Sequence, residues 1–348
     1  MKKIICIIVF ISLNEPFVLG LAPQSQNTRH EKFELVEDIS DIYPADSDRF
    51  EKHAFETMFE GFIIRRGNEL YVLKYHIPET AGLRWKDQND PIREYVAFRI
   101  SRAVGSNICD VIIPEKAERL YLANIVSTEE NPVHPDQVYL VRLGFNYKRD
   151  DDQVIQKDFY TAVIYNFLTA FLLRVYDYNN LNISRLEDSD VNITFDEEQG
   201  FHPSCLDVES FSKLFIDGYF QGAYPKKLSD FCDRVINLDV IRKFIAFLDG
   251  LPLEKILEEI ASDIRKTEIH YSDSALEEHF SFVRNTRRRF RKDLVDFICK
   301  ILDYNGPKIN RDIADDEVAR LKLKIASAIL PAEYSHDKPR QSNVLAGA

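Results

Sequence analysis

The chain has 348 residues, with 57 acidic against 45 basic side chains and a formal net charge of −12. Its 45% of apolar residues excludes a wholly disordered protein, and its length suits one large domain or two lobes. The acidic balance argues against nucleic acid as the main partner, because phosphate neutralisation needs surplus Lys and Arg.

The first twenty residues follow the pattern of a secretory signal peptide. A basic start at residues 1–3 precedes the apolar run 4–13, and small residues follow up to Gly20. The run is too short to span a bilayer, which takes about 20 residues. We therefore expect a secreted or periplasmic protein with no integral membrane span after signal removal. An uncleaved amphipathic start or membrane anchor is the alternative.

Four cysteines lie beyond the predicted signal: Cys109, Cys205, Cys232 and Cys299. Export would permit two disulfides, but four buried free thiols fit the sequence equally well, and the spacing does not choose among the three pairings. The chain has no CxxC or Cys/His cluster, so we expect no structural zinc site.

Residues 21–54 are predicted as a flexible leader, and regular patterns begin after it. The stretch 59–77 predicts two strands joined by a turn at Arg66-Gly67-Asn68. Pro91 opens a predicted helix that runs to Ala103. Further strands are predicted at 111–113, 118–126 and 138–145. We expect residues 55–146 to form a small, mostly antiparallel sheet lobe with one helix.

The charged stretch 147–156 marks a predicted boundary, and the chain beyond it is mostly helical. Residues 158–177 are apolar on nearly every face, which is typical of a helix buried inside a domain. A membrane span is the rival interpretation, but Asn166 and Arg174 count against it. Further helices are predicted at 238–248, 252–264, 274–302 and 315–329. We expect residues 147–305 to form a larger helical lobe, and residues 306–348 a last helix and a disordered tail.

The predicted buried helix runs directly into residue types that phosphoryl transfer needs. Asp177 is followed five residues later by Asn182, then by the hairpin-like stretch 183–195, and then by Asp196. An Asp can accept the proton of an attacking hydroxyl, and an Asn and an Asp can hold magnesium against ATP phosphates.

Two upstream residues complete this pattern. Lys74 lies in a predicted strand and Glu94 in the next predicted helix, the arrangement of the lysine and glutamate of a kinase site. Each residue also has an ordinary interpretation: Lys74 as a solvent-facing strand residue, Glu94 as a solvated helix residue, and 179–182 as a turn.

The stretch FLLRVYDYNNLN (171–182) resembles the catalytic loop of atypical protein-kinase-like enzymes, the phosphoinositide 3-/4-kinase-like and HipA-like groups. Residues 193–196 are similar to the metal-binding strand of these families, and residues 94–105 resemble their N-lobe helix. The resemblance implies an α+β, two-lobed protein-kinase-like fold, with a small antiparallel-sheet N-lobe and a larger helical C-lobe. It implies ATP and Mg as cofactors and a hydroxyl of a protein or lipid as the acceptor.

The resemblance also implies a role for each candidate residue on the nucleotide side. Lys74 would contact the α- and β-phosphates, Glu94 would hold Lys74, and Gly61 would belong to the loop that covers the nucleotide.

On the catalytic side, Asp177 would act as the base, and Asn182 and Asp196 would bind magnesium. Glu197 or Glu198 could replace Asp196 as the metal ligand. An exported kinase would find ATP inside a host cell, which makes a host-cell partner an expectation.

Three alternatives remain open. Tyr178 and Asn179 stand where the family has Arg and His, and the chain has no GxGxxG loop, which fits a secreted pseudokinase that binds nucleotide or a partner without turnover. The second is a related transferase that moves AMP, and the third is an unrelated exported α+β binding protein.

The basic run 284–292 also has two interpretations. It is either a solvated helix face that pairs with acidic residues, or a docking surface for an acidic substrate, phospholipid headgroup or partner.

Overall fold

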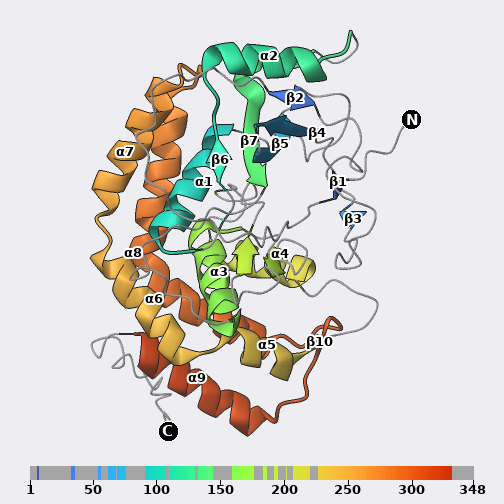
Figure 1. Cartoon of the computed structure of the whole chain (residues 1–348). Helices are drawn as coiled ribbons and strands as arrows, with labels where there is room; N and C mark the ends of the chain where they lie inside the picture. The colour runs from blue at the N-terminus through green and yellow to red at the C-terminus, as the bar shows by residue number, and fades with distance from the viewer. Residues whose placement is uncertain are drawn as a thin grey trace, which may run out of the picture. The chain divides into compact units, whose positions relative to one another are not determined.

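The computed structural model describes fifteen stretches of the chain: residues 6–7, 33–35, 54–55, 62–67, 69–75, 91–106, 108, 110–129, 132–143, 159–175, 183–185, 192–194, 201, 207–219 and 226–330. The chain divides into two compact units, whose helices and strands are labelled in Figure 1. Unit 1 comprises residues 1–162, 179–200 and 252–280, and unit 2 comprises residues 163–178, 201–251 and 281–348. The predicted α+β class, with a small antiparallel sheet and a mostly helical remainder, is confirmed.

Unit 1 contains a five-stranded antiparallel sheet with the strand order β2-β4-β5-β7-β6. Its strands are β2 (Glu34–Leu35), β4 (Phe62–Arg66), β5 (Glu69–Tyr75), β6 (Val111–Ile112) and β7 (Val138–Leu143). The predicted hairpin is confirmed, because Arg66 pairs with Glu69 across a tight turn in which Gly67 has a φ of 59°. Glycine suits this position because hairpin turns need positive φ, which residues with a Cβ rarely adopt.

One predicted strand is a helix. Residues 118–126 belong to α2 (Lys116–Val126), in which Arg119, Leu122, Ala123 and Val126 are buried. Burial at i, i+3, i+4 and i+7 is the period of one helix face, which the strand prediction overlooked. Leu122 and its neighbours pack on the sheet face that carries Tyr71, Leu73 and Tyr75 of β5.

Unit 1 also contains α1 (Pro91–Ala103), where the sequence predicts it, and α7 (Leu253–Lys266). They contact each other, and an ion pair joins Arg99 of α1 to Asp263 of α7. The fully buried Arg119 donates hydrogen bonds to the carbonyl oxygens of Pro114 (2.8 Å) and Thr267 (2.7 Å). Unit 1 therefore includes a helix, α7, that lies far from its sheet in the sequence. The predicted lobe boundary at residue 147 stays a prediction.

The shorter strands of the described residues form two-stranded pairs. β1 (Cys6–Ile7) pairs with β3 (Ala54–Phe55), and β8 (Ile183–Arg185) pairs with β9 (Asn192–Thr194), both antiparallel. In unit 2, β10 (Lys226–Lys227) pairs in parallel with β11 (Ile309–Asn310). The 3-10 helix η3 (Pro135–Gln137) leads into β7.

Unit 2 is helical and has an aromatic core. Its described helices are α4 (Val208–Tyr219), α5 (Leu228–Val235), α6 (Leu238–Gly250), α9 (Asp315–Ile329), the part of α3 (Phe159–Leu173) from residue 163 on, and the part of α8 (Asp273–Asp303) from residue 281 on. Phe171 of α3 packs against Phe211 of α4 and Phe297 of α8, with ring centroids 5.6 and 5.2 Å away. The predictions of α3, α6, α7, α8 and α9 as helices are confirmed. Within the described stretches, no helix is long and apolar enough to cross a membrane.

The cysteines partly resolve the disulfide question. Cys232 and Cys299 are both free and partly buried, so the alternative of two disulfides is wrong. Cys109 and Cys205 lie outside the described residues. Burial raises the pKa of the Cys232 thiol to about 12, and it also raises that of Cys299.

Candidate functional site

Lys74 lies on β5, the central strand of the sheet, opposite Tyr139 of β7. Successive side chains of a strand point to opposite faces. Because Leu73 and Tyr75 pack in the cluster with α2, Lys74 faces the other side of the sheet. Tyr139, which shares that face, is fully buried, and Lys74 is partly buried.

Glu94 is only 1% exposed and lies in the first turn of α1. Ala97, Phe98 and Ser101 of the same helix face are buried too. A carboxylate is almost never buried to this degree unless a cation or hydrogen-bond donors compensate its charge. The interpretation of Glu94 as a solvated helix residue is therefore wrong. Lys74 and Glu94 both belong to unit 1, while their direct pairing stays a prediction.

The predicted hairpin between the two metal-ligand candidates is confirmed. Ile183 of β8 pairs with Thr194 of β9, and Arg185 pairs with Asn192 at the other end. In the sequence, Asn182 directly precedes β8, and Asp196 follows β9 by two residues. Asn182, Asp196, Asp177 and Gly61 themselves lie outside the described residues, so their roles stay predictions.

Helix α3 ends at Leu173, earlier than the sequence predicts, because the next residue takes a left-handed conformation. Arg174 has a φ of 59°, and its N–H donates to the carbonyl oxygen of Phe171 at 3.3 Å. The N–H of Val175 donates to the carbonyl oxygen of Ala170 at 2.8 Å. This is the hydrogen-bond pattern of a Schellman C-cap, with Arg at the position that glycine usually occupies.

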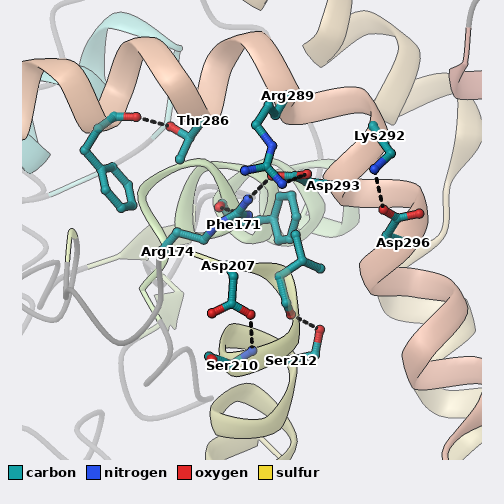
Figure 2. A network of polar contacts seen from close by, with 12 residues as sticks. Phe171, Arg174, Asp207, Ser210, Ser212, Thr286, Arg289, Lys292, Asp293 and Asp296 are labelled. Carbon is teal, nitrogen blue, oxygen red and sulfur yellow. Dashed lines mark hydrogen bonds and ion pairs between the residues drawn. The ribbon is translucent and has the colours of Figure 1, made fainter.

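The side chain of Arg174 is held in a buried polar network (Figure 2). Its guanidinium donates to a carboxylate oxygen of Asp293 at 2.6 Å and to the carbonyl oxygen of Phe171 at 2.9 Å. Only 1% of the Arg174 side chain and 2% of the Asp293 side chain are exposed. The guanidinium also lies over the Phe171 ring, 4.2 Å from its centroid.

Asp293 has a second cationic neighbour. Arg289, one helical turn earlier on α8, lies 3.2 Å from its other carboxylate oxygen and is half exposed. Burial raises the pKa of Asp293 above its ordinary value, and the charges of Arg174 and Arg289 oppose that rise. Sequence reasoning used Arg174 only to argue against a membrane span. A lone Arg at the end of an apolar helix also indicates a buried acidic partner, but the sequence does not say which one.

The basic run 284–292 lies on α8, and several of its side chains contact other residues of unit 2. Arg287 donates to the carbonyl oxygen of Asp249 at 2.8 Å, near the end of α6, and Arg291 donates to that of Ile329 at 3.2 Å, at the end of α9. Arg291 also pairs with the Asp249 carboxylate, and Lys292 pairs with Asp296. Cations at helix C-termini satisfy carbonyls that have no partner inside the helix and oppose the helix dipole. These contacts favour the interpretation of the run as a helix face that pairs with acidic residues.

Over the described stretches, no group of three or more His, Cys, Asp or Glu side chains is placed to hold a metal ion. The two predicted magnesium ligands lie outside those stretches. In unit 1, the described candidate features are the Lys74 face of the sheet, the buried Glu94 and the β8–β9 hairpin. In unit 2, the Arg174 cap directly precedes the part of the sequence that holds Asp177.

Comparison with known proteins gives a structural similarity. No protein-family model matches the chain, and no curated protein matches it. Among solved structures, the chain is similar to a Helicobacter pylori proinflammatory kinase, CtkA, with 14% identity and a TM-score of 0.35. The match covers 71% of this chain and 93% of that one. A similarity at this level does not show a shared activity.

Proposed function

We propose that the chain is a protein-kinase-like phosphotransferase that transfers a phosphoryl group from Mg-ATP to a hydroxyl of a protein or lipid. The observation that supports this most is the burial of Glu94, at 1% exposure, in the helix that follows the Lys74 strand. Burial of a carboxylate is costly unless a cation or hydrogen-bond donors compensate it, and Lys74 is the cation that the proposal assigns to Glu94.

On the nucleotide side, the residue types present fit a polyphosphate. Lys74 supplies a positive charge from the central strand of the sheet, and its partial burial strengthens that charge's attraction to phosphate. Glu94 would orient the Lys74 ammonium group. Gly61 precedes β4 directly and would let backbone approach the phosphates closely.

On the catalytic side, bound Mg-ATP would supply the phosphoryl group. Asp177 would orient the acceptor hydroxyl and accept its proton, and Asn182 and Asp196 would hold magnesium. The antiparallel β8–β9 pairing supports this assignment, because the two ligand candidates flank the Ile183–Thr194 pair in the sequence.

The test is transfer of label from ATP carrying a labelled γ-phosphate, with the full chain, magnesium, and either a mixed Ser/Thr/Tyr peptide or phosphoinositide vesicles as acceptor. We expect transfer by the wild type, and a loss of at least about a hundredfold in Asp177→Asn and in Asp196→Asn. Glu197→Gln and Glu198→Gln remove the same charge next to Asp196 and are expected to retain transfer. Transfer that survives in Asp196→Asn and disappears in Glu197→Gln would contradict the assignment of the metal ligand.

The second candidate function is a pseudokinase, and Tyr178 and Asn179 favour it because they replace the family's Arg and His. Mg-ATP binding without transfer of the γ-phosphate would identify this function. Label carried over from the α-phosphate would instead identify an AMP transferase.

Secretion and a host-cell partner are part of the same proposal, and residues 1–20 support them as a signal sequence. N-terminal sequencing of exported protein tests this step. A mature chain that begins near residue 21 is expected, and an exported chain that retains residues 1–20 would contradict it.

A further inference from the structure

The segment that carries most of the proposed site is bounded in the sequence by Leu173 and Phe201, which both belong to unit 2. It begins after α3 and ends at Phe201, and both of these ends are described. The N–H of Phe201 donates to the carbonyl oxygen of Leu173 at 2.9 Å, so a backbone hydrogen bond joins the two ends. Residues 175–200, which include Asp177, Asn182 and Asp196, lie between them in the sequence.

Both ends of this segment have strained backbone conformations. Arg174 has a φ of 59° and Phe201 a φ of 60°, the left-handed region that glycine adopts without penalty. Over the described part of the chain, Glu268 is the one further non-glycine residue with positive φ, and it is exposed at the end of α7. Strain of this kind persists where surrounding contacts impose it, and it is concentrated at functional sites.

The contacts that hold both strained residues come from the same helix, α8. Arg174 forms its buried ion pair with Asp293 at 2.6 Å. Phe201, only 5% exposed, packs edge-on against Phe282, with ring centroids 5.2 Å apart. Asp293 and Phe282 lie three turns apart on α8, so one rigid helix fixes both ends.

We propose that Leu173, Arg174, Phe201, Phe282 and Asp293 form a clamp that fixes both ends of residues 175–200 on α8 and so positions the segment for phosphoryl transfer. The catalytic part of this inference rests on the proposed function. Arg174 and Phe201 are positioning residues, which act through the segment and need no contact with nucleotide or acceptor. The segment carries the proposed base Asp177 and the proposed magnesium ligands Asn182 and Asp196, so loss of the clamp should lower turnover and also weaken Mg-ATP binding.

The test uses glycine substitutions in the full chain, because glycine keeps the left-handed backbone and removes only the anchoring side chain. Phe201→Gly removes one anchor. Arg174→Gly combined with Asp293→Asn removes the other without leaving a buried unpaired charge. Glu268→Gly is the matched control, because it relieves the same backbone strain at a position outside the clamp. Arg174→Lys keeps the positive charge, so it is expected to retain more activity than the variant that carries Arg174→Gly and Asp293→Asn.

Two measurements are made on each variant. Hydrogen exchange of peptides within 175–200 should become at least fivefold faster in both clamp variants and stay unchanged in Glu268→Gly, while α3 keeps its protection. The kcat for phosphoryl transfer should fall at least tenfold in both, and Mg-ATP should bind more weakly as well, because the segment carries the proposed magnesium ligands.

The failure of the clamp and the failure of the proposed function give different results. Unchanged exchange within 175–200 overturns the clamp, whatever the activity. Faster exchange with wild-type kcat overturns its positioning role. A wild-type chain that transfers no phosphate refutes the proposed function, while faster exchange in the clamp variants alone still supports the clamp as the device that fixes the segment.

Discussion

Replacing Arg174 by Met tests the buried ion pair that ends α3. Met keeps the length and much of the packing of Arg over the Phe171 ring, but it leaves the Asp293 carboxylate buried without its main cation. Removal of one partner from a buried pair costs about 3–5 kcal/mol. Because Arg289 remains 3.2 Å from Asp293, we expect the lower end, about 3 kcal/mol.

Urea unfolding followed by circular dichroism measures this loss. With a slope of about 2 kcal/mol per molar urea, the midpoint should fall by about 1.5 M. In the double variant Arg174→Met/Asp293→Leu, both charges are gone, so its loss should be smaller than the sum of the single losses by about 2 kcal/mol. A loss below about 1 kcal/mol in Arg174→Met, or strictly additive losses, would refute the importance of the pair.

The destabilisation caused by Arg174→Met should depend on pH. Burial raises the pKa of Asp293 in the folded protein above its ordinary value of 3.8. A raised pKa means that the folded state binds the proton more tightly than the unfolded state does. Proton binding at Asp293 therefore adds to the free energy of unfolding below pH 3.8, and this stabilisation is lost as pH rises through the folded pKa. Arg174 opposes this rise, so its removal should raise the pKa of Asp293 further. Once Asp293 is protonated in both proteins, the missing cation no longer matters, and the destabilisation by Arg174→Met should therefore shrink on acidification. A destabilisation that grows on acidification would contradict this reasoning.

Three further predictions concern other parts of the two units. Arg99 and Lys266 hold the pKa of Asp263 below its usual range, so this carboxylate stabilises unit 1 above pH 3.8. Asp263→Asn should therefore lower the free energy of unfolding at pH 7 by under about 1 kcal/mol, as measured by thermal unfolding, and the difference should disappear as pH falls through the folded pKa. Phe297→Ala, at the centre of the aromatic core, should cost about 3–5 kcal/mol in urea unfolding, whereas the partly exposed Phe247→Ala should cost under about 1 kcal/mol, and equal losses would contradict this placement of the core. Because burial raises the pKa of the Cys232 thiol to about 12, native protein should react with a thiol reagent at Cys232 far more slowly than urea-unfolded protein, as mass spectrometry of the labelled peptide can show.

Local sequence patterns predicted much of the fold. The β4–β5 hairpin followed from Gly67, and α1 followed from Pro91 and the helical period after it. The α2 prediction failed because hydrophobic and aromatic residues such as Leu120 and Tyr121 suggested a strand, although both are exposed on the outer side of the helix.

Long-range contacts account for what the sequence could not predict. Arg174, whose left-handed conformation ends α3, is held by Asp293, which lies 119 residues later in the sequence. Nothing in the local pattern of Glu94 indicated that packing of α1 would bury it, because acidic residues in first helical turns are ordinarily solvated. Of the candidate site residues, Lys74 and Glu94 are placed by the structure, and the assignments of Gly61, Asp177, Asn182 and Asp196 still depend on sequence spacing and the β8–β9 pairing.

The most direct test of the proposed site is thermal unfolding of the full chain with and without ATP and magnesium. A ligand at a hundredfold excess over its Kd stabilises the native state by about 2.7 kcal/mol. We predict a rise in the unfolding midpoint that requires magnesium, that is lost in Lys74→Met and Asp196→Asn, and that persists in Glu197→Gln. An unchanged midpoint at millimolar ATP and magnesium, or a rise of equal size in Lys74→Met and Asp196→Asn, would contradict a nucleotide site built from these residues.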